Sequence, residues 1–111
     1  MSDSDQPSAA GSNSAEDQTR QEAIVRVLDI RNSRGLHARA SAKFVQTVEK
    51  FDAVVKVTRS GETVGGDSIM GLMMLSAGVG TSITVEARGA EAAEVMAALE
   101  TLVSGRFGEE D

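Results

Sequence analysis

The sequence predicts an α+β fold, an open-faced β-sandwich in which a four-stranded, mainly antiparallel sheet carries three helices on one face. Apolar periodicity places the elements in the order β-α-β-β-α-β-α between residues 23 and 108. The strands alternate apolar and polar side chains, which is typical of a sheet covered on one face only. Two of the helices are long and amphipathic enough to supply that cover.

The first two predicted elements lie on either side of a polar turn. Residues 23–31 are rich in Ile, Val and Leu and predict a strand, and the turn sequence NSRG follows at 32–35. Residues 37–50 then predict an amphipathic helix, because apolar side chains recur there at helical spacing. These side chains are Phe44, Val45, Val48 and Phe51.

A hairpin follows the first helix. Residues 53–58 carry apolar side chains at alternate positions and predict the second strand. Ser60 and Gly61 form a tight turn that leads into a short return strand at 62–64. The glycine pair at 65–66 ends that strand.

The second half of the domain contains a short helix, a strand and a long helix. Asp67 or Ser68 can cap a short helix at 69–75, and residues 81–88 show the clearest strand alternation of the chain. A final amphipathic helix is predicted because apolar residues again follow helical spacing, with glutamates on the opposite face. Its apolar residues are Ala92, Val95, Met96, Leu99, Leu102 and Val103.

The formal net charge of −6 belongs to the two ends of the 111-residue chain. Residues 1–22 hold five acidic side chains against one arginine and no large apolar residue after Met1, so we expect a disordered acidic extension. Residues 109–111 are all acidic and predict a C-terminal tail. The remaining domain, 23–108, has neither a Lys/Arg run nor Trp or Tyr to stack bases, so no nucleic-acid partner is expected.

Composition excludes several kinds of site. The absence of cysteine excludes disulfides, thiolate metal sites and cysteine nucleophiles, and one histidine excludes a multi-histidine zinc site. We therefore expect no metal and no cofactor. No apolar run approaches the length of a membrane span, and the N-terminus lacks the pattern of a signal peptide. A cytoplasmic protein with no membrane partner is the expectation.

The single histidine is the candidate reactive group. His37 follows Gly35 at the start of the first long helix, where backbone N–H groups and the helix dipole stabilise an anion. Imidazole is a competent nucleophile near neutral pH, and the guanidinium of Arg39 matches phosphate oxygens in a bidentate fork. A phosphohistidine site fits this arrangement. The alternative is a surface histidine without chemistry, beside a solvated arginine.

Two separated motifs resemble those of a known family. The stretch RGLHARASAKFV at 34–45 is similar to the active-site stretch of HPr, the histidine-containing phosphocarrier of the phosphoenolpyruvate-dependent phosphotransferase system. The stretch GDSIMGLMML at 66–75 resembles the regulatory serine and second helix of that family. The resemblance covers about 23–108 and implies the open-faced β-sandwich already predicted.

The resemblance implies a relay function. His37 would accept a phosphoryl group on Nδ1 from the phosphohistidine of Enzyme I and pass it to a downstream phosphotransferase component, with Arg39 as the phosphate-facing cation. Such a chain is a stoichiometric phosphocarrier rather than an enzyme, and a monomer is expected. The family usually has proline where this chain has Ala40, which restores a backbone N–H near the phosphate. We expect altered phosphate affinity rather than loss of function.

Ser68 and the helix after it form a second candidate region. The position of Ser68 alone predicts a plain helix N-cap. The resemblance implies that Ser68 is also phosphorylated by HPr kinase/phosphorylase. The helix is apolar on every side, so part of it is exposed. The resemblance implies that Leu72 and Leu75 face inward, and that the partner-docking residues are Ile69, Met70 and Met73. The alternative is that the methionines fill gaps in the core.

Other functions stay open at this stage. A regulatory HPr paralogue could act mainly by partner binding through Ser68 and the second helix. A small hydrolase could use His37 as its nucleophile with Asp29 or Asp67 nearby in space. A nucleotide-binding loop at 66–71 is excluded, because Leu72 and Met73 stand where Lys and Ser or Thr would be required. The acceptor, and the choice between a sugar branch and a nitrogen-related branch, are not indicated.

Overall fold

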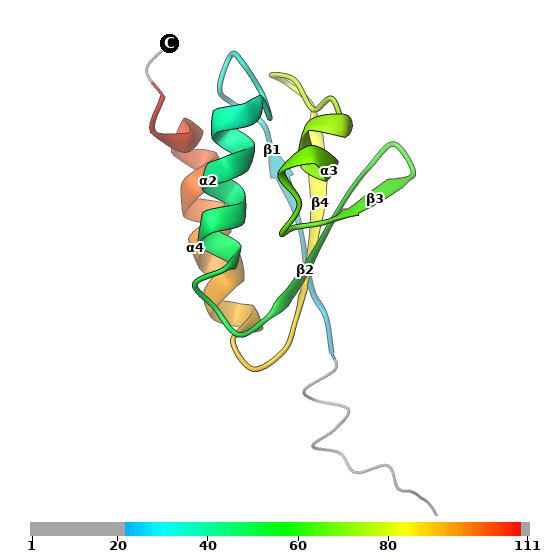
Figure 1. Ribbon diagram of the computed structural model, residues 1–111, viewed down its shortest axis with the longest axis vertical. Coiled ribbons are helices and arrows are strands. Elements are labelled where there is room, and N and C mark those ends of the chain that lie inside the picture. Colours follow the sequence, from blue (N-terminus) through cyan, green and yellow to red (C-terminus); the bar gives the residue numbers. More distant parts are fainter. Residues whose placement is uncertain (1–21, 110–111) are drawn as a thin grey trace, which may run out of the picture.

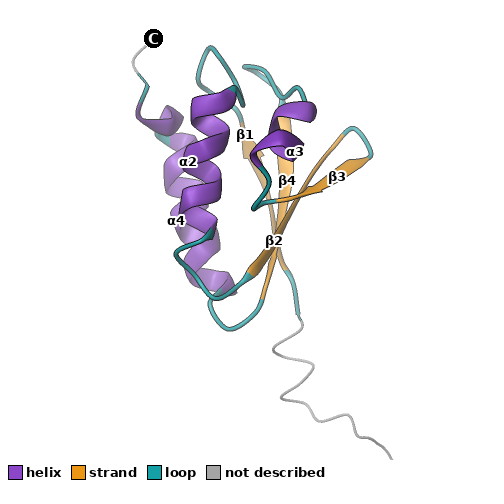
Figure 2. Ribbon diagram, viewed as in Figure 1, coloured by secondary structure: helices purple, strands orange, loops and turns teal. Residues whose placement is uncertain are grey.

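The structure is a computed structural model that describes residues 22–109. Its strands and helices follow the predicted order (Figures 1 and 2), and a short 3₁₀ helix extends the C-terminal end. The elements are β1 (Ile24–Asp29), α2 (Ala38–Val48), β2 (Val54–Arg59), β3 (Glu62–Gly65), α3 (Ile69–Met74), β4 (Ser82–Arg88), α4 (Ala92–Ser104) and η2 (Arg106–Gly108). The predicted disordered extension lies outside the described residues except for Glu22, and of the acidic tail only Glu109 is described.

The sheet has four strands in the order β1-β4-β2-β3, and every neighbouring pair is antiparallel. Strand β4 lies between β1 and β2. Leu28 of β1 lies opposite Ile83 of β4, and Val57 of β2 lies opposite Val85 of β4. Because side chains alternate along each strand, this register places the buried apolar residues of three strands on one face, whereas Val25, Val27 and Val54 are exposed on the other. The predicted α+β fold is confirmed.

The core lies between that face and the helices. Helices α2 and α4 run side by side along one side of the sheet, and α3 lies beside α2 (Figure 1). The buried apolar strand residues, such as Val57, Ile83 and Val85, pack against Phe44 of α2 and Leu99 of α4. The other face of the sheet has no helix on it within residues 22–109, as the open-faced prediction requires.

The structure changes the bounds of the first helix. It begins at Ala38 and ends at Val48, whereas the sequence predicted 37–50. His37 has extended backbone angles (φ −73°, ψ −178°) and is the residue that precedes the helix rather than its first turn. Its carbonyl accepts the first helical hydrogen bond, from the N–H of Ser41 at 2.9 Å. This places the imidazole at the helix N-terminus.

Candidate functional site

The loop between β1 and α2 is held by backbone and amide hydrogen bonds. Gly35 has φ +64° and its N–H donates to the carbonyl of Asn32 at 3.1 Å. The Asn32 side-chain amide donates to the carbonyl of Gly35 at 2.8 Å, and the N–H of Leu36 donates to the carbonyl of Ala77 at 2.9 Å. Leu36 is buried, so the loop is anchored on both sides of Gly35. These contacts fix the backbone that carries His37.

The imidazole of His37 is partly open to solvent at the start of α2. Its side chain is 22% exposed and makes no capping hydrogen bond to the helix backbone. A helix start leaves its first N–H groups without intrahelical acceptors and carries a partial positive charge. Since residue 40 is alanine, the helix also keeps the backbone N–H that proline would remove. An anion on this imidazole would lie beside unpaired donors.

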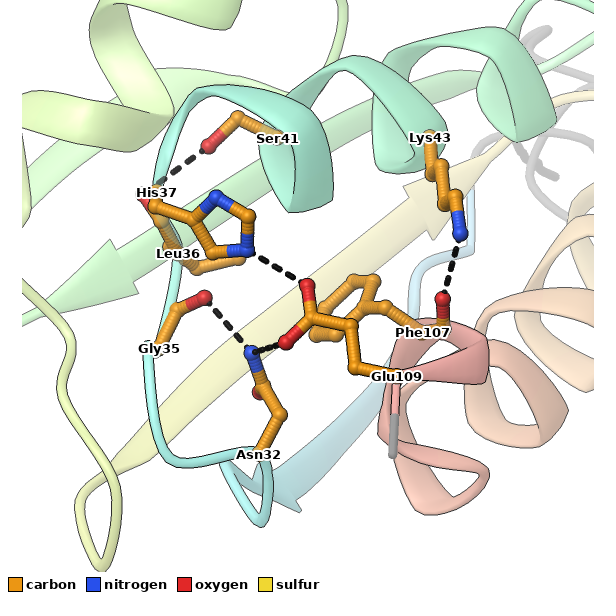
Figure 3. A network of polar contacts seen from close by, with 8 residues as sticks. All are labelled: Asn32, Gly35, Leu36, His37, Ser41, Lys43, Phe107 and Glu109. Carbon is orange, nitrogen blue, oxygen red and sulfur yellow. Dashed lines mark hydrogen bonds and ion pairs between the residues drawn. The ribbon is translucent and has the colours of Figure 1, made fainter. Parts of the chain in front are cut away.

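A carboxylate from the far end of the chain contacts the imidazole. Oε2 of Glu109 lies 2.5 Å from Nε2 of His37, and its Oε1 accepts a hydrogen bond from Asn32 Nδ2 at 3.0 Å (Figure 3). Burial alone would raise the pKa of Glu109. The hydrogen bonds from His37 and Asn32, together with the charges of His37 and Arg34, outweigh burial and bring that pKa below its ordinary 4.5. Glu109 is therefore ionised at neutral pH.

Glu109 is the site residue that sequence reasoning missed. The sequence assigned it to the acidic tail, and the hydrolase alternative proposed Asp29 or Asp67 as the carboxylate near His37. In the structure Asp29 accepts a hydrogen bond from Ser82 Oγ at 2.8 Å at the end of β1. Asp67 is exposed in the turn before α3. The carboxylate that contacts the imidazole is that of Glu109.

Two arginines lie near His37 in the chain. Arg39 is in the first turn of α2 and is exposed, and Arg34 is exposed in the preceding loop. An exposed guanidinium in the first turn remains available to the oxygens of an incoming phosphoryl group. His37 and the exposed Arg39 therefore both lie at the N-terminal end of α2.

Ser68 is the N-cap of α3. Its Oγ accepts a hydrogen bond from the N–H of Gly71 at 2.9 Å, and its backbone is extended (φ −116°, ψ 108°). The capping role predicted from position is confirmed. Capping and phosphorylation need the same oxygen, and a phosphate at this position would still face the helix N–H groups.

Helix α3 exposes an apolar surface beside Ser68. Its side chains at Ile69, Met70 and Met73 are exposed, and Met70 reaches 73%. Leu72 and Leu75 are buried, as the family resemblance implied. Met74 is a further exposed side chain of the same helix, which the docking set did not include. We call Ile69, Met70, Met73 and Met74 the α3 patch. The segment just beyond α3 contacts the loop of His37, because the carbonyl of Ala77 accepts the hydrogen bond from Leu36.

Two features are absent from the described part of the chain. Within residues 22–109, no group of three or more His, Cys, Asp or Glu side chains is arranged to bind a metal ion. In the same range, every helix is too short or too polar to span a bilayer.

Comparison with known proteins identifies the family. The family model "PTS HPr component phosphorylation site" matches residues 24–105. The phosphocarrier protein HPr of Neisseria meningitidis serogroup A is 54% identical over 82 residues, which are 74% of this chain and 92% of that protein. HPr of Cupriavidus necator is 50% identical over 78 residues, which cover 70% of this chain and 88% of that one.

Solved structures agree with the sequence relatives. The crystal structure of HPr-C-His from Thermoanaerobacter tengcongensis has a TM-score of 0.76 and 38% identity, and the match covers 79% of this chain and 99% of that one. HPr from Bacillus anthracis str. Ames gives a TM-score of 0.70 at 36% identity, over 73% of this chain and 96% of that one. The sequence match, the open-faced fold and the histidine at the helix start agree, and the chain belongs to the HPr family of phosphocarrier proteins of the phosphotransferase system.

Proposed function

We propose that this chain accepts a phosphoryl group on Nδ1 of His37 from the phosphohistidine of Enzyme I and passes it to a downstream phosphotransferase component. The observation that carries the proposal is the position of His37, partly exposed at the N-terminus of α2, inside the stretch that matches the family's phosphorylation-site model. The chain would then be a stoichiometric carrier rather than an enzyme, acting in the cytoplasm as a monomer.

The transfer follows from the groups at the site. The Nδ1 lone pair of His37 attacks phosphorus, a new N–P bond forms as the N–P bond of the donor breaks, and the electron pair of the broken bond returns to the donor imidazole. The phosphoryl oxygens then lie beside the first N–H groups of α2, including that of Ala40. Arg39 would balance their charge through its guanidinium. No metal on this chain is required by this step.

We also propose that the α3 patch docks Enzyme I and other partners, with Ser68 as a switch at its edge. Exposed methionines suit a surface that adapts to several partners, because their side chains are flexible and polarisable. Phosphorylation of Ser68 by HPr kinase/phosphorylase would add about −1.5 to −2 charge next to this apolar surface. Desolvating that charge in an interface is unfavourable, so docking would weaken.

Phosphoryl transfer from Enzyme I tests the proposal. The chain is incubated with Enzyme I and phosphoenolpyruvate, and protein-bound acid-labile phosphate is measured, with His37→Ala as the control. Labelling of the wild type alone, followed by discharge on addition of an acceptor component, supports the relay. Wild-type labelling that is matched by the His37→Ala variant contradicts it.

A second candidate function is regulation by partner binding through Ser68 and the α3 patch. The exposure of Met70 and its neighbours beside the Ser68 cap favours it. A pure regulator would bind its partner after Ser68 phosphorylation but would gain no phosphate from Enzyme I. Slow loss of phosphate from the isolated phosphorylated chain, in contrast, would argue against a hydrolase that uses His37 as its nucleophile.

A further inference from the structure

The segment after α4, residues 105–109, has an unusual backbone. Arg106 and Phe107 have φ values of 60° and 55°, although neither is glycine. Residues other than glycine adopt this strained left-handed conformation only where the surrounding contacts hold them in it. Two such contacts are present: the Phe107 ring is buried, with 1% of the residue exposed, and its carbonyl accepts a hydrogen bond from Lys43 Nζ at 2.6 Å. The segment is thus fixed to α2 and the core.

This anchoring places Glu109 at the imidazole. The side chain of Glu109 is only 12% exposed, and its two oxygens contact different partners, His37 Nε2 and Asn32 Nδ2. Figure 3 shows Glu109 between the His37 ring and the Asn32 amide, with Phe107 behind it. The family motifs at 34–45 and 66–75 do not include any of this segment.

Asn32 links the carboxylate to the loop of His37. The residue is fully buried, and its amide nitrogen donates both to the carbonyl of Gly35 and to Glu109. A side-chain amide nitrogen has two hydrogens, so both are used. This arrangement sets the distance between the Glu109 carboxylate and the backbone that carries the imidazole.

We propose that Glu109 is a positioning residue for the phosphoryl acceptor, which holds the His37 proton on Nε2 and leaves Nδ1 as the nucleophile. An ionised carboxylate can only accept hydrogen bonds, so its contact with Nε2 requires the proton to be on that nitrogen. In the neutral ring the other nitrogen then carries the free lone pair. The inference rests on the proposed function, because it assigns the reactive nitrogen of that relay.

The same contact stabilises the ring during transfer. When Nδ1 forms its bond to phosphorus, Nε2 keeps its proton and positive charge develops on the imidazole. A carboxylate that already accepts from Nε2 stabilises that charge, as the carboxylate partner does for histidine in other sites. Arg34 in this loop and Arg39 in the first turn of α2 are the charged residues nearest to His37 in the chain. Both are exposed, whereas Glu109 is nearly buried.

The variant Glu109→Gln separates this role from mere packing. Glutamine has the same shape, but it has one oxygen and one NH2 group in place of two acceptors. If its oxygen keeps the contact with Asn32, its NH2 faces Nε2 and favours the tautomer protonated on Nδ1. The alternative orientation sets two NH2 groups against each other. We expect the variant to shift the His37 tautomer toward Nδ1–H and to lower kcat for phosphorylation by Enzyme I about tenfold with little change in KM.

The 15N chemical shifts of the His37 ring report its tautomer, and they are measured on the free full-length chain at a pH where the imidazole is neutral. Glu94→Gln, an exposed glutamate of α4, is the matched control, and circular dichroism verifies that both variants fold. The inference is supported if His37 carries its proton on Nε2 in the wild type and in Glu94→Gln, and if Glu109→Gln shifts the proton toward Nδ1 and slows phosphoryl transfer. An unchanged tautomer in Glu109→Gln overturns it without touching the proposed function. A wild-type chain that Enzyme I does not phosphorylate overturns the proposed function instead.

Discussion

A Cβ atom on Gly35 would lie 2.3 Å from the carbonyl oxygen of Ala77, which is closer than any real side chain approaches such an atom. The same carbonyl accepts the hydrogen bond from Leu36 at 2.9 Å. The loop that carries His37 therefore packs directly against the backbone that leaves α3. Only glycine fits here, because the site also requires φ +64°.

We predict that Gly35→Ala lowers the free energy of unfolding by about 3 kcal/mol or more, since strain and overlap act together. Gly61→Ala is the matched control, because Gly61 also has positive φ (+81°) but no atom within 4 Å of its Cβ position. That variant should lose only about 1 kcal/mol. Urea unfolding of both variants checks the prediction, and equal losses would show that the contact with Ala77 is not restrictive.

The second prediction concerns the cation at the site. If Arg39 balances the transferring phosphoryl group, Arg39→Lys should slow phosphorylation by Enzyme I markedly, because lysine keeps the charge but loses the bidentate fork. Loss of one such contact corresponds to about 2–4 kcal/mol, or roughly 30- to 1,000-fold in rate. Rapid-quench kinetics measure this. A wild-type rate in Arg39→Ala would show that the charge has no part in transfer.

The third prediction concerns the cap of α3. Ser68→Asp should slow His37 phosphorylation without unfolding the chain, because aspartate still caps the helix while it adds charge beside the α3 patch. Ser68→Asn is the control, since asparagine caps equally well without the charge. Kinase-treated protein should show a larger decrease than Ser68→Asp. Equal transfer rates for unmodified and fully Ser68-phosphorylated protein would leave Ser68 as a cap only.

The fourth prediction follows from the lowered pKa of Glu109. A carboxyl group whose folded-state pKa lies below its unfolded value stabilises the fold above the unfolded value, here about 4.5, and loses that contribution as pH falls through the folded value. Wild type should therefore be more stable than Glu109→Gln at pH 5 to 6, by on the order of 1 kcal/mol. The difference should decline below about pH 4.5. Thermal unfolding across this range checks it, and a difference that grows in acid would contradict the assignment.

Much of the fold could be predicted from the sequence, because the apolar periodicity agrees with the observed burial. In β4, Ile83, Val85 and Ala87 alternate with polar residues, and these three apolar side chains are buried. The position of His37 was readable for a local reason, because the turn before it and the helical spacing after it both mark a helix start. Ser68 was found as a cap in the same way, and its contact with Gly71 lies within one turn.

The contact between Glu109 and His37 could not be predicted from the sequence, for two physical reasons. The residues are 72 positions apart, so no local pattern connects them. The path between α4 and Glu109 also depends on positive φ at Arg106 and Phe107, which residue type does not indicate. A single buried aromatic, Phe107, among glycine and charged residues was the one available signal. It shows that the chain end packs on the core, but not what its carboxylate contacts.

The most direct test of the central claim is to locate the phosphoryl group after reaction with Enzyme I and phosphoenolpyruvate. Phosphohistidine is lost in acid and survives alkali, whereas phosphoserine survives acid, so intact mass before and after each treatment separates His37 from Ser68. The account predicts one acid-labile, alkali-stable phosphoryl group per chain, absent from His37→Ala and present in Ser68→Ala. An acid-stable group, or labelling that persists in His37→Ala, would contradict it.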